Sequence, residues 1–211
     1  MLLDRPDVGE KDVGEKAREK LEIAIVEQDL AQVQRLVQEN PRIVSSKDDN
    51  SRNPLHIAAT EGNVPISQIL LNYNAAIDAR DKWELTPLFL AIYEEPLVLD
   101  RVPIVRLLLE NGADVDARNA SGDTPLHRAA FGEDEVVKLL LEHGAEVNAV
   151  NDAGETPLHK AVQYPEYEVV QELLRHGGLK TVRNSHGLTP VQIAEARGWT
   201  RIVEIFHSTP V

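Results

Sequence analysis

The sequence predicts an all-α repeat solenoid of about six stacked units, and three recurring features predict it. A short segment centred on a proline occurs five times, with the prolines 33, 38, 32 and 33 residues apart. Each segment leads into one or two alanines and then into an apolar stripe with helical spacing, such as Val136 to Leu141. A helix-terminating segment that contains glycine follows, as at Gly112 and Gly144. Each such unit alone has one uncovered apolar face, so only stacking buries a continuous core.

The five proline segments have the chemistry of helix starts. Proline is tolerated in the first helical turn because its missing N–H has no partner there. The preceding threonine can cap the helix by accepting an orphan amide, and glycine suits the left-handed backbone at a helix end. The segments are Asn53-Pro54-Leu55-His56, Thr86-Pro87-Leu88-Phe89, Thr124-Pro125-Leu126-His127, Thr156-Pro157-Leu158-His159 and Thr189-Pro190-Val191-Gln192.

This period and these motifs resemble the ankyrin repeat, from roughly Glu15 to the C-terminus. The resemblance implies a helix–turn–helix pair and a β-hairpin loop in each unit. It also implies that His56, His127 and His159, which share one motif slot, are structural and bond to the backbone of a neighbouring loop. A catalytic or metal-binding role for these imidazoles is therefore not expected.

We expect residues 1–14 to form a flexible N-terminal tail and residues 15–211 a single domain. The first unit is an N-terminal cap with helices over 16–27 and 30–39, and Glu195 in the last unit suits a solvated end of the array. Five extra residues between Glu94 and Pro103 lengthen a turn of the third unit. Whether this insertion or the tail takes part in binding stays open. The expected units are 15–47, 48–80, 81–118, 119–150, 151–183 and 184–211.

Composition narrows the class of protein. The 211 residues include 35 Asp+Glu against 22 Lys+Arg, a net charge of −13, and no cysteine. Clustered basic residues for nucleic acid are absent, as are a membrane-length apolar run and a secretory signal. We therefore expect a cytoplasmic protein, with the nucleus as the alternative, that binds neither nucleic acid nor membrane.

Motifs for catalysis are missing from the sequence. It contains no phosphate-binding glycine loop, no G-x-S-x-G elbow and no H-E-x-x-H zinc motif. We predict a non-enzyme without a cofactor or metal.

The resemblance implies that partners meet a concave groove made by the loop tips and the exposed face of each first helix. The chain has nine aromatic residues, and four of them fall on this surface: Trp83, Tyr93, Phe131 and Tyr164, with Leu85 beside them. Aromatic side chains dominate binding hot spots, so these five residues are the predicted centre of a protein-binding site. The alternative is that they pack against one another or cover the two turns of altered length.

Charged residues surround this centre and predict the chemistry of the partner. They suit a protein segment with hydrophobic anchors and flanking Lys or Arg, bound by a chain that is monomeric alone. Two alternatives remain: a regulator that occludes an enzyme or transcription factor, and a self-associating structural protein. The surrounding residues are Asp49, Arg52, Glu61, Glu94, Asp123, Asp152 and Glu155.

Overall fold

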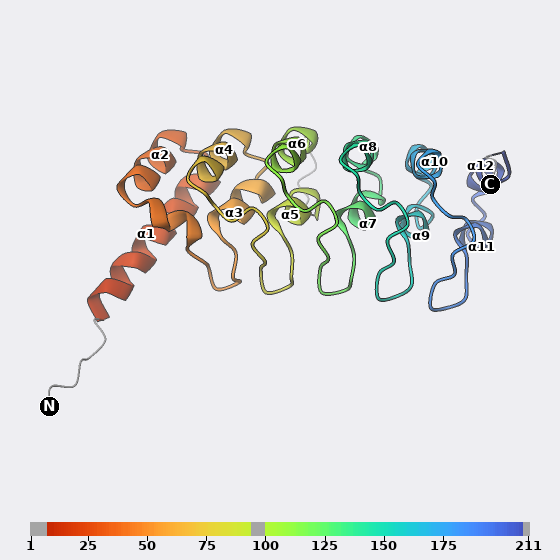
Figure 1. Cartoon of the computed structure of the whole chain (residues 1–211), viewed down its shortest axis with the longest axis horizontal. Helices are drawn as coiled ribbons and strands as arrows, with labels where there is room; N and C mark the ends of the chain where they lie inside the picture. Colours follow the sequence, from red (N-terminus) through yellow and green to blue (C-terminus); the bar gives the residue numbers. More distant parts are fainter. Residues whose placement is uncertain (1–7, 94–99, 209–211) are drawn as a thin grey trace, which may run out of the picture.

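The computed structural model describes residues 8–93 and 100–208, and the side chains within them except those of residues 8–13 and 93. The described helices lie in two rows with a row of loops beneath them, forming an elongated molecule (Figure 1). The first helices of the pairs make the lower row and the second helices the upper row. The pairs are α1 (Val8–Val26) and α2 (Leu30–Glu39), α3 (Pro54–Thr60) and α4 (Val64–Asn72), α5 (Pro87–Tyr93) and α6 (Val102–Glu110), α7 (Pro125–Ala129) and α8 (Asp134–Glu142), α9 (Pro157–Ala161) and α10 (Tyr167–Arg175), and α11 (Pro190–Ala196) and α12 (Thr200–Ser208), with a 3₁₀ turn η1 (Pro41–Ser45) after α2.

Each proline segment starts a first helix, as the sequence predicts. At α7, the Thr124 hydroxyl accepts from the backbone N–H of His127, and the Thr124 N–H donates to Nδ1 of His127. This reciprocal cap satisfies two backbone groups that a helix end otherwise leaves unpaired. The same arrangement starts α3, α9 and α11, where Gln192 replaces the histidine in the last of them.

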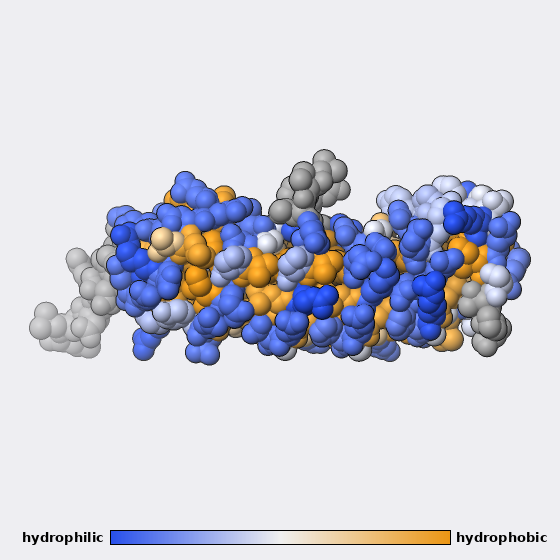
Figure 2. Space-filling view, turned by 90° about the horizontal axis from the view of Figure 1, so that it is seen from above, coloured by the Kyte–Doolittle hydropathy of each residue, from blue (hydrophilic) through white to orange (hydrophobic). Residues whose placement is uncertain are grey.

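The core runs the length of the solenoid because each helix packs on its counterparts in neighbouring units. The motif leucines Leu55, Leu88, Leu126 and Leu158 are fully buried, one in each successive first helix. Burial of each contributes about 1.5–3 kcal/mol. On the side of the second helices, apolar residues form a band along the molecule between blocks of hydrophilic ones (Figure 2).

An Asp or Asn side chain organises each loop between units. At the second loop, Oδ1 of Asp81 accepts from the backbone N–H of Trp83 at 2.8 Å and of Leu85 at 2.9 Å. The same pair of bonds recurs in every loop of the row. The organising residues are Asp48, Asp81, Asn119, Asn151 and Asn184.

Neighbouring loops are joined edge to edge by backbone hydrogen bonds. The N–H of Ala120 donates to the carbonyl of Trp83 at 3.2 Å, and the N–H of Asp152 to that of Ser121 at 3.1 Å. Equivalent bonds join the first pair and the last pair of loops. The loop row is therefore a continuous hydrogen-bonded edge that fixes the spacing of the loop tips.

The structure differs from the sequence-based expectation at two points. Helix α1 begins at Val8 rather than at Lys16, so part of the expected tail is helical. The hairpins are closed by backbone bonds, such as Asp81 N–H to the Leu85 carbonyl at 3.0 Å, but no described residue forms a strand. Residues 94–99 of the insertion lie outside the described residues. None of the described helices is long and apolar enough to cross a membrane.

Candidate functional site

Three of the predicted aromatic residues are accessible on the first-helix and loop face. Trp83 stands at the tip of the second loop with 49% of its surface exposed. Tyr164 follows α9 and is 54% exposed, and Phe131 follows α7 and is partly buried. The Phe131 and Tyr164 rings meet edge to face, with centroids 5.8 Å apart and planes at 73°. These two rings therefore pack against each other, while Tyr164 stays more than half exposed.

Trp83 is anchored through its backbone and leaves its indole on the surface. Asp81 holds its N–H, and the next loop holds its carbonyl. The Nζ of Lys82 lies 4.2 Å from the indole centroid and also bonds to Oδ1 of Asn50 in the preceding loop. Because both the N–H and the carbonyl of Trp83 are hydrogen-bonded, the backbone that carries the indole is held in place.

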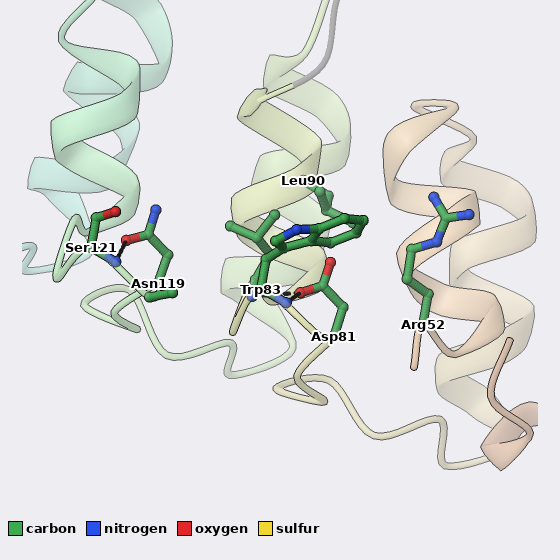
Figure 3. A pocket seen from close by; sticks show the side chains of 8 residues that line it. Arg52, Asp81, Trp83, Leu90, Asn119 and Ser121 are labelled. Atoms are coloured by element: carbon green, nitrogen blue, oxygen red, sulfur yellow. Dashed lines mark hydrogen bonds between the residues drawn. The ribbon is translucent and has the colours of Figure 1, made fainter. Parts of the chain in front are cut away.

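A pocket of about 450 Å³ opens beside Trp83 (Figure 3). Its size falls within the range of about 300–1,000 Å³ that is common for ligand sites. Leu85 and Leu90 supply apolar wall, and they pack with Phe89 in a small cluster separate from the main core. The lining residues are Arg52, Asp81, Trp83, Leu85, Leu90, Asn119, Ala120 and Ser121.

A second pocket, of about 360 Å³, adjoins the first through Asn119. Phe89 and Phe131 line it, together with Asp123 and Arg128. The Arg128 guanidinium lies 5.6 Å from the centroid of the Phe131 ring. We call the residues that line these two pockets the groove; they come from the third and fourth units and, in Arg52, from the second.

The three motif histidines have the expected structural role. His56, His127 and His159 are fully buried, and Nε2 of each contacts a backbone carbonyl of the next loop, at 2.9–3.2 Å. Burial lowers the pKa of each imidazole, opposed in part by that same carbonyl contact. Nδ1 of each ring accepts a backbone N–H. A neutral imidazole that carries its proton on Nε2 can therefore make this bond and also donate to the carbonyl of the next loop.

Models of known protein families match nearly the whole repeat region of this chain. Models described as ankyrin repeats in three copies match residues 21–119 and 98–151, and a model for many copies matches residues 140–194. The chain belongs to the ankyrin-repeat family. Ankyrin repeats generally mediate protein–protein interactions and are typically non-catalytic.

One curated relative is similar to a short part of this chain. A stretch of 60 residues is 38% identical to the serine/threonine-protein kinase VIK of Arabidopsis thaliana. It covers 28% of this chain and 14% of that kinase, and it lies over the repeat region. The likeness concerns the ankyrin repeats.

The ankyrin array brings Trp83, Phe131 and Tyr164 to one face, but one predicted centre residue is placed differently. Leu85 is 8% exposed, because its side chain packs with Phe89 and Leu90. It therefore forms part of the pocket wall instead of an exposed tip. The side chain of Tyr93 and all of Glu94 lie outside the described residues.

The predicted charged rim is partly neutralised within the chain. Lys160 lies 2.7 Å from Glu155 and 3.7 Å from Asp123, and Arg52 bonds Asp48 at 2.9 Å. Asp49 and Asp152 are exposed.

One rim residue is placed away from the loop tips. Glu61 lines a different pocket, beside Asp100 and Pro103, near the lengthened turn. It therefore does not join the groove beside Trp83.

Seven residues that line the two pockets were not in the predicted site: Asp81, Phe89, Leu90, Asn119, Ala120, Ser121 and Arg128. Phe89 carries a visible signal, because it replaces the motif histidine. Asp81 carries another, because the three loops that follow have asparagine at its position. Among the described residues, no three His, Asp or Glu side chains are arranged to hold a metal ion.

Proposed function

We propose that this chain is a non-catalytic interaction module that binds a partner protein in the groove between Trp83 and Tyr164. The observation that carries the proposal is the pair of adjoining pockets on the loop and first-helix face, walled by Trp83, Phe89 and Phe131. Exposed aromatic side chains beside concave, partly apolar pockets are the usual anchors of an interface.

The partner we propose is a protein segment with hydrophobic anchors and basic flanks. The aromatic residues would set its residence time, while the exposed Asp49 and Asp152 and the net charge of −13 would favour its encounter. Asp123 and Glu155 contribute less than their charge suggests, because Lys160 lies against both.

Affinity capture from native lysate tests the proposal. The wild-type chain is compared with a variant carrying Trp83→Ala, Tyr93→Ala, Phe131→Ala and Tyr164→Ala. A matched control carries Ile23→Ala, Val26→Ala and Leu30→Ala, which remove exposed apolar side chains from the first unit. Circular dichroism verifies that all three fold. A protein that is retained by the wild type and the control and lost from the aromatic variant supports the groove, whereas equal retention by all three contradicts it.

The alternatives differ in measurable consequences. A regulator would use the same groove and would also change the activity of the captured enzyme or transcription factor. A self-associating protein would show a mass in light scattering that grows with concentration, and we expect a monomer instead because the net charge opposes association. The cytoplasmic location stays a prediction.

A further inference from the structure

A buried carboxylate oxygen lies beside Trp83 without a hydrogen-bond partner. Asp81 is 3% exposed, and its Oδ1 is fully used by the backbone N–H groups of Trp83 and Leu85. Oδ2 is buried and accepts no hydrogen bond from the described residues. Leaving such an oxygen unsatisfied is costly, because a carboxylate loses its hydration on burial.

The equivalent residues of the other loops do not have this surplus acceptor. In the first loop, Oδ2 of Asp48 accepts from Nε of Arg52 at 2.9 Å. Arg52 stands four residues after Asp48. The equivalent position in the second loop, four residues after Asp81, is Leu85, so no arginine stands there to bond Oδ2. The remaining three loops carry asparagine, whose second side-chain atom is a donor.

The unsatisfied carboxylate lies in the wall of the 450 Å³ pocket. In Figure 3, one Asp81 oxygen bonds to the loop and the other points toward the side on which the Trp83 ring lies. Arg52, on the opposite wall, is held by Asp48. Lys82 is exposed, bonds to Asn50 and is not among the lining residues, and its Nζ lies 4.2 Å from the centroid of the Trp83 ring.

We propose that this pocket receives an arginine side chain of the partner segment, an inference that rests on the proposed function. The guanidinium donates to Oδ2 of Asp81 and stacks on the indole of Trp83, while Leu85 and Leu90 contact the methylene groups. Trp83 is the half-exposed part of the wall, so its ring can turn to admit the side chain without disturbing the packed core.

Arginine fits this wall better than other donors. A neutral donor would satisfy the oxygen but leave the buried negative charge uncompensated. Lysine carries the charge, but its ammonium is strongly hydrated and does not stack on an aromatic face as a guanidinium does. A planar guanidinium provides the charge, the donor and the stacking surface together.

Titration of the whole ¹⁵N-labelled chain with Nα-acetylarginine amide, followed by NMR, tests this inference. The two comparison probes are Nα-acetylcitrulline amide, which has the same shape without the charge, and Nα-acetyllysine amide. Probes of this size bind in the millimolar range. We expect the arginine probe to shift the Trp83 indole N–H and the Leu85 amide, with about tenfold weaker binding of citrulline and weaker binding of lysine.

Asp81→Asn is the decisive variant, because asparagine organises the loops at 119, 151 and 184 of this same chain. It should keep the fold and weaken the arginine probe about tenfold. Glu110→Gln is the matched control, because it removes one exposed charge from the same unit, on α6. Equal binding of arginine and citrulline, tighter binding of lysine, or full binding by the Asp81→Asn variant would each overturn the inference.

Failure of this inference can be told apart from failure of the proposed function. If the arginine probe does not bind but the partner is still lost from the four-alanine variant, the result supports the groove as the partner-binding site and contradicts the arginine pocket. If the four-alanine variant retains the partner, the proposed function is contradicted, whether or not the arginine probe binds.

Discussion

The Nε2 atom of His56 lies 3.1 Å from the backbone carbonyl oxygen of Leu85 in the next loop. This bond links a first helix to the loop of the following unit. His127 and His159 repeat it with Glu155 and Leu188. Phe89 occupies the same motif slot and has no ring nitrogen to offer, so it packs with Leu85 and Leu90 instead. The apolar wall of the groove lies where the histidine is replaced.

The histidine links predict how stability depends on pH. Because burial lowers the pKa of His56, His127 and His159 in the folded chain, the unfolded chain binds more protons below about pH 6.5. Their contribution is present above that pH and is lost as pH falls toward the folded pKa values. Each proton that the unfolded chain binds and the folded chain does not adds up to about 1.4 kcal/mol per pH unit to the slope of the unfolding free energy against pH.

Urea unfolding between pH 7.5 and 5.0, at about half-unit steps, measures this slope. The variant His56→Gln, His127→Gln, His159→Gln should flatten it. Glutamine is compatible with the motif slot, because Oε1 of Gln192 accepts from the Thr189 N–H at 3.0 Å. An unchanged slope in the folded triple variant would contradict the assignment to these imidazoles.

Two glycines with the same backbone conformation are predicted to differ in how much stability is lost when alanine replaces them. Gly154 and Gly187 have φ of +71° and +72°. A Cβ at Gly154 would lie 3.0 Å from the backbone nitrogen of Ser185, whereas one at Gly187 would meet nothing within 4 Å. We expect Gly187→Ala to cost about 1 kcal/mol and Gly154→Ala about 2–3 kcal/mol. Equal losses in thermal unfolding would show that loop-to-loop contact is unimportant.

The edge-to-face pair Phe131 and Tyr164 is predicted to couple two units energetically. A double-mutant cycle with Phe131→Leu and Tyr164→Leu should give an interaction energy of about 0.5–1.5 kcal/mol. Equilibrium unfolding of the four proteins measures it. Additive effects would mean that the rings meet without stabilising the array, leaving both of them available to a partner at no cost to the fold.

The unpartnered carboxylate of Asp81 predicts a stabilising substitution. Asp81→Asn keeps Oδ1 as the loop acceptor and removes a buried charge, so we expect the free chain to gain about 1 kcal/mol. Asp48→Asn is the matched comparison and should lose about 1 kcal/mol, because it breaks the bond to Arg52. Denaturant unfolding of both variants decides, and a loss at both positions would indicate that Asp81 is satisfied in solution.

Local motif chemistry was sufficient to predict much of the fold. The Thr-Pro starts and the alanines defined the helix pairs, and α2 was predicted with its observed bounds, Leu30–Glu39. The start of α1 was missed, because a short repeated acidic segment has no pattern that distinguishes a helix from a tail. The accessible aromatics at 83, 131 and 164 were predicted because an in-phase repeat gives each position a known side of the unit.

The sequence by itself determined the repeat architecture, since caps, helix stops and apolar periodicity act within about 33 residues. Only the tertiary structure decided which loop residues share a pocket. Leu85 is buried because Phe89 and Leu90 of its own unit fold back on it. Oδ2 of Asp81 accepts no hydrogen bond from the described residues, and Arg52, which lines the same pocket, is held by Asp48 of the preceding loop. Such outcomes depend on competition between side chains of adjacent loops, whose contacts form only when the units stack.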